Sequence, residues 1–90
     1  MSSGWKIEYE GRARKHLKKL DRTAAIRIVR DLEEDLARTG DPRAFGKALV
    51  GEWSGFWRYR IGEYRAIAKI EDDIVTIFII EVAHRRDVYR

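Results

Sequence analysis

Cysteine is absent from these 90 residues, and histidine occurs only twice. Without cysteine the chain can form neither a disulfide nor a thiolate metal site, which favours a reducing compartment such as the cytoplasm. Two histidines at unremarkable spacing assemble no metal site, and no glycine-rich phosphate loop is visible, so we expect neither a metal nor a cofactor. No apolar run approaches the roughly 20 residues that span a bilayer, and the first residues lack the apolar stretch of a signal peptide, so we expect no membrane partner.

The charge balance is mildly basic. Nineteen Lys and Arg face fifteen Asp and Glu, which gives a net charge of +4 in a chain that is 44% hydrophobic and 38% charged. This composition favours a single folded domain over residues 1–90 rather than a disordered chain. A basic domain suits a polyanionic partner such as nucleic acid or an acidic protein, but +4 is equally compatible with ordinary solubility. The placement of the cations must therefore distinguish between these two interpretations.

Hydrophobic periodicity predicts one strand and two helices in the first half of the chain. Residues 5–9 alternate between apolar and polar side chains, as in a half-buried strand. Helical spacing begins at Gly11, and Asp21 can cap a second helix that ends near Gly40, before Pro42. The apolar stripe expected to face the core of this second helix consists of Ala25, Val29, Leu32 and Leu36.

The second half reads as strands joined by tight turns. We expect a loop or short extended segment over 40–52, followed by strands over 53–61, 64–70 and 74–82. The segment 74–82 is nearly all apolar, as in a central strand covered on both faces. The resulting order, β-α-α-β-β-β, predicts an α+β fold with two N-terminal helices packed on one face of a mostly antiparallel, four-stranded twisted sheet.

The arginines of the predicted strands fall on one face. If the apolar residues of 57–61 face the helices, the period of two puts Arg58 and Arg60 on the opposite face. Arg65 lies across the hairpin, and Arg85 follows the last strand. Guanidinium groups gathered in this way can bind phosphate through pairs of hydrogen bonds. The competing interpretation is an open sheet face solvated by charge, to which Lys69 and Glu81 would belong.

Other polar and aromatic residues are more ambiguous. The basic run 12–19 favours a solvated helix face, and His16 within it a surface position. His84 is either a strand-end residue or a member of the arginine site, and Tyr89 either packs on the sheet or stacks on an unpaired base. The three tryptophans are Trp5, Trp53 and Trp57. They are expected in the core rather than at a base-stacking site, because they share faces with apolar positions.

These features resemble a known family. The element order, the segment KAL at 47–49, the stretch WRYRIGEYR at 57–65 and the ending VAHRRDVY at 82–89 are together similar to the RelE branch of the RelE/ParE toxin superfamily. The resemblance covers essentially the whole chain. Its two informative pieces are the Tyr-Arg pair after the hairpin turn and the ending from His84 to Tyr89.

The resemblance implies an mRNA interferase, a metal-independent endoribonuclease that cleaves messenger RNA in the ribosomal A site. In such toxins the 2′-OH of the RNA attacks the adjacent phosphate, leaving a 2′,3′-cyclic phosphate and a 5′-OH. The resemblance also implies a RelB-like antitoxin as partner in a hetero-oligomer, with messenger RNA and the ribosome as targets.

The family pattern assigns roles by position. Arg58 and Arg60 match the basic pair, Arg65 the arginine that stabilises transition-state charge, Arg85 the leaving-group side and Tyr89 the nucleotide-orienting tyrosine. Some members carry lysines where this chain has Arg58 and Arg60. Because arginine is effectively never deprotonated, the general base is open, with His84 preferred and Tyr89 next.

Two alternatives remain at this point. A ParE-like toxin would inhibit DNA gyrase by binding, and a non-catalytic RNA-binding module would bind RNA without cutting it. The mRNA interferase interpretation depends on where five side chains meet in space. We expect one anion-binding pocket formed by Arg58, Arg60, Arg65, Arg85 and Tyr89.

Overall fold

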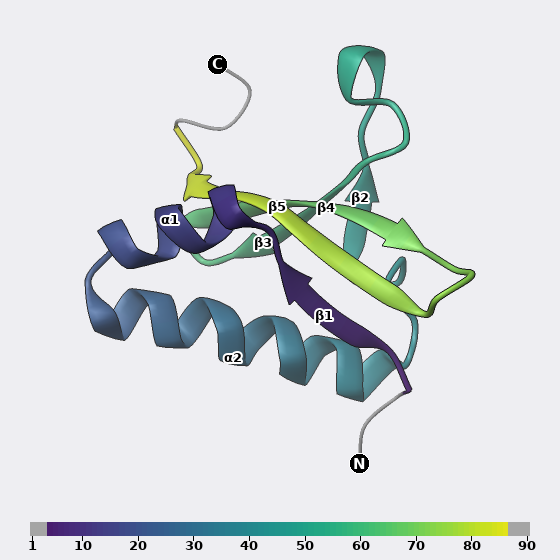
Figure 1. Ribbon diagram of the computed structural model, residues 1–90, viewed down its shortest axis with the longest axis horizontal. Coiled ribbons are helices and arrows are strands. Elements are labelled where there is room, and N and C mark those ends of the chain that lie inside the picture. Colours follow the sequence, from purple (N-terminus) through teal and green to yellow (C-terminus); the bar gives the residue numbers. More distant parts are fainter. Residues whose placement is uncertain (1–3, 87–90) are drawn as a thin grey trace.

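The computed structural model describes residues 4–86 (Figure 1). Its elements are β1 (Lys6–Tyr9), α1 (Gly11–Lys19), α2 (Arg22–Thr39), β2 (Gly46–Ala48), a 3₁₀ turn η1 (Gly51–Trp53), β3 (Trp57–Ile61), β4 (Tyr64–Glu71) and β5 (Thr76–His84). The strands form one sheet in the order β1-β5-β4-β3-β2. The β1–β5 pair is parallel and the other three pairs are antiparallel. The expected α+β arrangement is confirmed, with α2 running along one face of the sheet (Figure 1).

The sheet has five strands, so the expected count of four was wrong. The additional strand is β2, which pairs with β3 through Gly46↔Tyr59, Lys47↔Arg58 and Ala48↔Trp57. Three residues are too few to display an alternating pattern, which explains why the sequence indicated only a short extended segment there.

Two strand limits also differ from the prediction. The segment expected to begin at residue 53 begins at Trp57, because the preceding residues form η1 and a loop. The segment expected at 74–82 runs instead from Thr76 to His84. Val75 has a φ of 50° and Ile74 is 58% exposed, so both belong to the turn that precedes β5.

The second helix begins and ends where the sequence indicated. The Asp21 side chain accepts hydrogen bonds from the N–H groups of Thr23 at 2.8 Å and Ala24 at 3.2 Å, and Gly40 ends the helix with a φ of 68°. The buried stripe differs in part from the expected one, since Ala25 and Val29 are only half-buried. Its centre is shifted to Ile28, Leu32 and Leu36.

These helical side chains pack on the inward face of the sheet to form the core. The buried cluster comprises Ala13, Ile28, Leu32, Leu36, Tyr59, Ile61, Ala66, Ala68, Ile77, Ile79 and Val82. Trp5 packs against its edge as expected, but Trp53 and Trp57 lie outside it. Trp57 instead lies under the guanidinium of Arg43, 5.7 Å from its ring centroid. The core prediction was therefore wrong for these two tryptophans.

Beyond the end of β1, helix α1 lies along the same side of β5. The parallel pairing of β1 with β5 ends at Tyr9↔Ile79, so the later residues of β5 need other partners on that side. The Nδ1 atom of His16 accepts the backbone N–H of Val82 at 3.4 Å. His16 is half-buried, so the expectation of a surface histidine was wrong, and its imidazole instead satisfies an edge donor of the sheet.

Candidate functional site

The open face of the sheet carries a row of cations on β2 and β3. Tyr59 and Ile61 point into the core, where they are 1% and 2% exposed, so the alternating residues Arg58 and Arg60 lie on the opposite, open face. Lys47 pairs directly with Arg58 and therefore shares that face. The sequence analysis did not select Lys47, because its orientation depends on a strand too short to recognise.

Arg65 lies next to these residues. It is the direct cross-strand partner of Arg60, and its Nη1 donates to the carbonyl oxygens of Gly62 at 3.3 Å and Tyr64 at 3.1 Å. Directly opposed residues in an antiparallel pair have Cβ atoms about 4.5–5.5 Å apart, so two like charges meet here at short range.

The pKa of the Arg65 guanidinium lies below its usual value. The largest cause is burial, followed by the positive charges of Arg60, Arg58 and Arg85, while the carboxylate of Glu63 acts in the opposite direction. Arg58, Arg60 and Arg85 therefore each lie close enough to repel Arg65, and we call these four residues the arginine cluster. Since arginine stays protonated in proteins, only anions such as the Glu63 carboxylate or a bound phosphate can offset this repulsion.

Arg85 joins the cluster through the β3–β4 turn. Its backbone N–H donates to the carbonyl oxygen of Glu63 at 2.8 Å, and its Nε lies 3.2 Å from Glu63 Oε1. Glu63 is 63% exposed, so solvent screens this ion pair. Glu63 was not among the predicted site residues, although its carboxylate lies beside Arg85.

His84 lies on the other face of the sheet. It pairs in register with Tyr64, against whose ring its imidazole packs edge-on at 5.8 Å, whereas the neighbouring pair Arg65↔Ala83 faces the open side. Its Nδ1 accepts the N–H of Arg86 at 3.3 Å. The structure thus brings four of the predicted site residues together. His84 faces away from them and reaches the site only through Glu63, whose Oε1 lies 4.0 Å from its Nε2. Tyr89 lies beyond the described residues 4–86.

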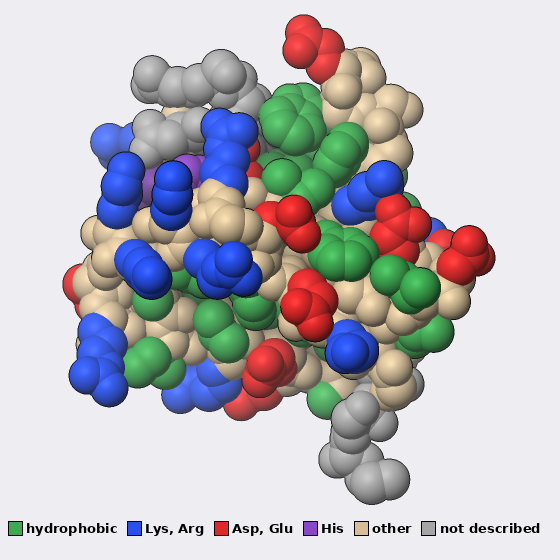
Figure 2. Space-filling model, in the orientation of Figure 1, with side chains coloured by type: hydrophobic (Ala, Val, Ile, Leu, Met, Phe, Trp, Pro, Cys, Tyr) green, Lys and Arg blue, Asp and Glu red, His purple; other side chains and the backbone are tan. Residues whose placement is uncertain are grey.

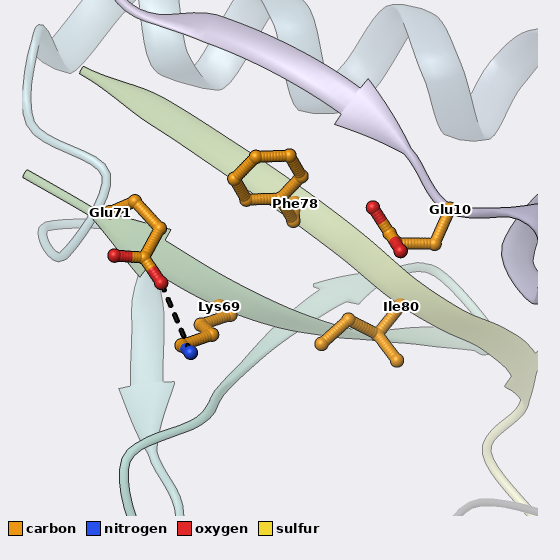
Figure 3. Close-up of a pocket in the computed structure, with 5 residues that line it drawn as sticks. All are labelled: Glu10, Lys69, Glu71, Phe78 and Ile80. Carbon is orange, nitrogen blue, oxygen red and sulfur yellow. Dashed lines mark ion pairs between the residues drawn. The ribbon is translucent and has the colours of Figure 1, made fainter. Parts of the chain in front are cut away.

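The open face is divided into two chemically different halves. Away from the arginine cluster, Phe78 and Ile80 of β5 form an apolar strip beside Glu10 (Figure 3). Lys69 and Glu71 of β4 form an ion pair of 3.1 Å there. The charge of Lys69 is therefore balanced locally by Glu71, whereas the arginines gather at the end nearest Gly62.

A second group of cations lies on α1. The residues Arg12, Arg14, Lys15, Lys18 and Lys19 are all exposed, as a solvated helix face requires. Figure 2 shows Lys and Arg side chains gathered on the α1 side of the molecule and Asp and Glu side chains near the β4–β5 turn. Arg12 reaches Glu81 at 3.7 Å, so this group adjoins the open face. Such a distribution attracts polyanions toward one side of the molecule.

Within residues 4–86, no group of three or more His, Asp or Glu side chains is arranged to hold a metal ion. None of the helices in this range combines the length and apolar character needed to cross a bilayer. The residues that dominate the site are thus guanidinium groups, whose chemistry is phosphate binding and charge stabilisation.

Comparison with proteins of known structure supports the same architecture. The chain superimposes on a chain of the toxin–antitoxin complex RelBE2 from Mycobacterium tuberculosis with a TM-score of 0.82 and 32% identity, covering 92% of this chain and 93% of that one. It also matches the isolated RelE toxin of E. coli with a TM-score of 0.67 and 22% identity, over 89% of this chain and 83% of that one, a likeness of fold.

Sequence comparison identifies relatives of the same kind. The chain is 34% identical over 84 residues to the toxin RelG of Mycobacterium tuberculosis, covering 93% of this chain and 94% of RelG. Residues 7–89 match the family described as the ParE toxin of the type II toxin–antitoxin system parDE. With its fold and arginine cluster, this chain belongs to the ParE toxin family, and is a type II toxin of the RelE/ParE superfamily.

Proposed function

We propose that this toxin is a ribosome-dependent endoribonuclease that cleaves messenger RNA in the ribosomal A site. The observation that carries the proposal is the arginine cluster, in which Arg58, Arg60 and Arg85 repel Arg65 on an open sheet face. A toxin that acted only by packing against another protein would have little use for four guanidinium groups gathered at one spot. An RNA phosphate balances them.

The proposed reaction is an internal phosphoryl transfer. The 2′-oxygen of the RNA forms a bond to the adjacent phosphorus and loses its proton, while the bond between phosphorus and the 5′-oxygen breaks and that oxygen gains a proton. Negative charge increases on the non-bridging oxygens in the transition state, where Arg65 and Arg58 stabilise it. Arg85 is assigned to the leaving 5′-oxygen, and Arg60 holds the strand.

The general base must come from outside the arginine cluster, because arginine cannot supply it. His84 packs on Tyr64 and accepts the N–H of Arg86, so we assign it to positioning the segment that follows β5 rather than to proton transfer. Tyr89 keeps its proposed role in orienting a nucleotide and is the remaining predicted candidate for the base. A tyrosine would accept the proton only as the tyrosinate anion, the form that nearby cations favour.

We further propose that a RelB-like antitoxin neutralises the toxin in the cytoplasm. The structural relatives include several toxin–antitoxin complexes, among them RelBE from E. coli and RelE–RelB from Pyrococcus horikoshii. An antitoxin that covers the arginine cluster would balance its charge with carboxylates and exclude RNA.

Mapping the 3′ ends of messenger RNA on ribosomes after brief induction tests the proposed function. The wild-type toxin is expected to produce cuts within the codon in the A site and to stop protein synthesis. The double variant Arg65→Ala with Arg85→Ala is expected to lose cleavage by a factor of at least about 10². Cleavage that persists in the double variant would show that the arginine cluster is not the site.

The second candidate is inhibition of DNA gyrase by binding, which the match to the ParE toxin family favours. The same induction experiment separates the two candidates. Damage to DNA without codon-level cuts in messenger RNA would favour the gyrase inhibitor, and the Arg65→Ala and Arg85→Ala changes would then have little effect on toxicity.

A further inference from the structure

A pocket opens beside the arginine cluster, between β2, β3 and the loop that joins them. Its volume is about 350 Å³, and it is lined by Lys47, Ala48, Leu49, Val50, Trp53 and Arg58. Binding pockets for small groups begin at about 300 Å³ and combine apolar walls with a few placed polar groups. This pocket has an apolar wall and two cations, and none of the roles assigned above uses Trp53.

The loop that carries Trp53 is fixed by its own backbone. The N–H of Leu49 donates to Phe56 O at 3.0 Å and closes the loop, and within it Trp53 N donates to Val50 O at 3.3 Å and Phe56 N to Trp53 O at 3.0 Å. The indole of Trp53 also meets the Phe56 ring edge-on at 5.6 Å. Such an edge-on contact uses at most one face of the indole. Together with the backbone hydrogen bonds of the loop, it holds the ring in place before any ligand arrives.

Exposure also favours a ligand at this loop. Val50 is 83% exposed on its rim, and Trp53 is a half-buried tryptophan outside the hydrophobic core. Large apolar side chains placed together at the surface commonly mark an interaction site.

The pocket and the arginine cluster share Arg58, which lines the former and contributes to the repulsion at Arg65 in the latter. Lys47, opposite Arg58 in the sheet, extends the cations toward Trp53. Cations that follow a phosphate backbone, together with an aromatic ring on which a base stacks, are the combination by which proteins bind single-stranded nucleic acid.

We propose that this pocket binds one unpaired base of the RNA, stacked on Trp53, from a nucleotide next to the phosphate held by the arginine cluster. The inference rests on the proposed function and deepens it, because the pocket then contributes to the choice of sequence that is cut. Lys47 and Arg58 bind the phosphate on the pocket side, and Val50 covers the edge of the base.

An abasic scan tests the pocket without changing the protein. Short single-stranded RNA oligomers carry 2′-O-methyl groups, which block the attacking hydroxyl, and one base at a time is removed. Affinity for the wild-type toxin is measured by fluorescence anisotropy. We expect removal of the base at one position to lower the affinity about tenfold. That position must lie next to the phosphate whose charge contributes most to binding.

Variants of Trp53 then connect that loss to the pocket in a double-mutant cycle. In Trp53→Ala the intact oligomer is expected to bind about tenfold more weakly, and removal of the sensitive base should cost nothing further. Trp53→Phe keeps an aromatic face and is expected to restore most of the affinity. Trp5→Phe is the matched control, because Trp5 packs against the core at β1, and it should leave the abasic penalty unchanged.

Several results would overturn the proposal. One is an abasic scan without a sensitive position, and another is an abasic penalty that survives in Trp53→Ala. Loss of antitoxin binding but not of RNA binding in Trp53→Ala would assign the pocket to the antitoxin instead. Mapping of 3′ ends distinguishes the two proposals. If Trp53→Ala cleaves as the wild type does, with an unchanged sequence preference, the pocket proposal is wrong and the proposed function still stands.

Discussion

Arg65 is held by two backbone carbonyls and repelled by three other arginines. Glu63 is the carboxylate that lowers this repulsion, and it pairs with Arg85 at 3.2 Å. An RNA phosphate approaching Arg85 must therefore share that guanidinium with Glu63 or displace it. At the scale of single residues, Glu63 acts as an internal competitor for the proposed ligand.

Glu63→Gln is accordingly expected to strengthen binding of single-stranded RNA. Because the Glu63–Arg85 pair is exposed, the gain is modest, about two- to fivefold at low salt, and smaller at high salt. Anisotropy titrations at two salt concentrations measure it. The control is Glu71→Gln, which removes a carboxylate from the other half of the same face. Unchanged or weaker RNA binding in Glu63→Gln alone would contradict the competition.

The faces of the arginines near the β3–β4 turn could be predicted from the sequence, whereas the face of His84, beyond the bulge in β5, could not. Arg60 and Arg65 share a face because they are separated by a tight turn and the alternation is short. Between Ile67 and Ala68 the register with β5 shifts, and Ile80 has no partner. This extra residue reverses the alternation of β5, which turns His84 toward the helices. Nothing in the residue pattern marks such a bulge.

At the scale of elements, β2 depends on one glycine. A Cβ at Gly46 would lie 2.5 Å from Tyr59 Cε1 and 2.9 Å from Tyr59 Cδ1. That ring is 1% exposed, and its hydroxyl donates to Pro42 O at 2.8 Å, so it cannot turn aside. The close approach of β2 to β3 thus requires the absence of a side chain at residue 46.

Gly46→Ala is expected to lower the free energy of unfolding by about 1–3 kcal/mol, because the added methyl forces β2 away from Tyr59. Denaturant titration measures the change. Gly11→Ala is the control, since a Cβ there meets nothing within 4 Å, and its effect should stay within about 0.5 kcal/mol. Equal effects of the two substitutions would mean that β2 does not depend on this contact.

A second link between elements joins the α2–β2 loop to the β4–β5 turn. Arg43 donates to Asp72 through both terminal nitrogens, at 3.0 and 2.8 Å. These hydrogen bonds are the main reason that the pKa of Asp72 lies below its usual value of 3.8. A carboxylate with a depressed pKa stabilises the fold fully above the unfolded value, and this contribution is lost as the pH falls through the folded one.

Asp72→Asn is therefore expected to melt at a lower temperature than the wild type at pH 7. The difference should begin to shrink as the pH falls below about 3.8, and it should disappear once the pH has passed through the lower pKa of the folded state, where the wild-type carboxyl is also protonated. The shift is small because the pair is exposed to solvent. Thermal unfolding followed by circular dichroism across this pH range measures it. A difference that persists at acid pH would arise from something other than the charge of Asp72.

For the whole molecule, the element order and the helix-covered sheet could be predicted because long periodic segments and helix caps are strong signals. The parallel β1–β5 pair and the edge strand β2 could not, since pairing partners far apart in the chain leave no mark in local periodicity. The resulting fold brings cations from 58–65 and from residue 85 onto one face. If the proposed function is correct, their combined charge governs the binding of RNA.

The dependence of RNA affinity on salt measures that combined charge. Each phosphate contact to a single strand adds about 0.7 to the slope of log affinity against log salt concentration. Arg60→Gln is expected to lower the slope by about that amount, whatever the RNA sequence. Arg38→Gln is the control, because Arg38 pairs with Asp35 on α2, away from the open face. Equal slopes for both variants and the wild type would place RNA binding elsewhere.

The parallel pairing of β1 with β5 determines when a growing polypeptide can complete its sheet. β5 is the last of the five strands to be synthesised, yet it lies between β1 and β4, so the sheet stays open until then. Arg85 follows that strand and completes the cationic face. If the proposed function is correct, a ribosome that translates this message meets an assembled toxin only after it has decoded Arg85.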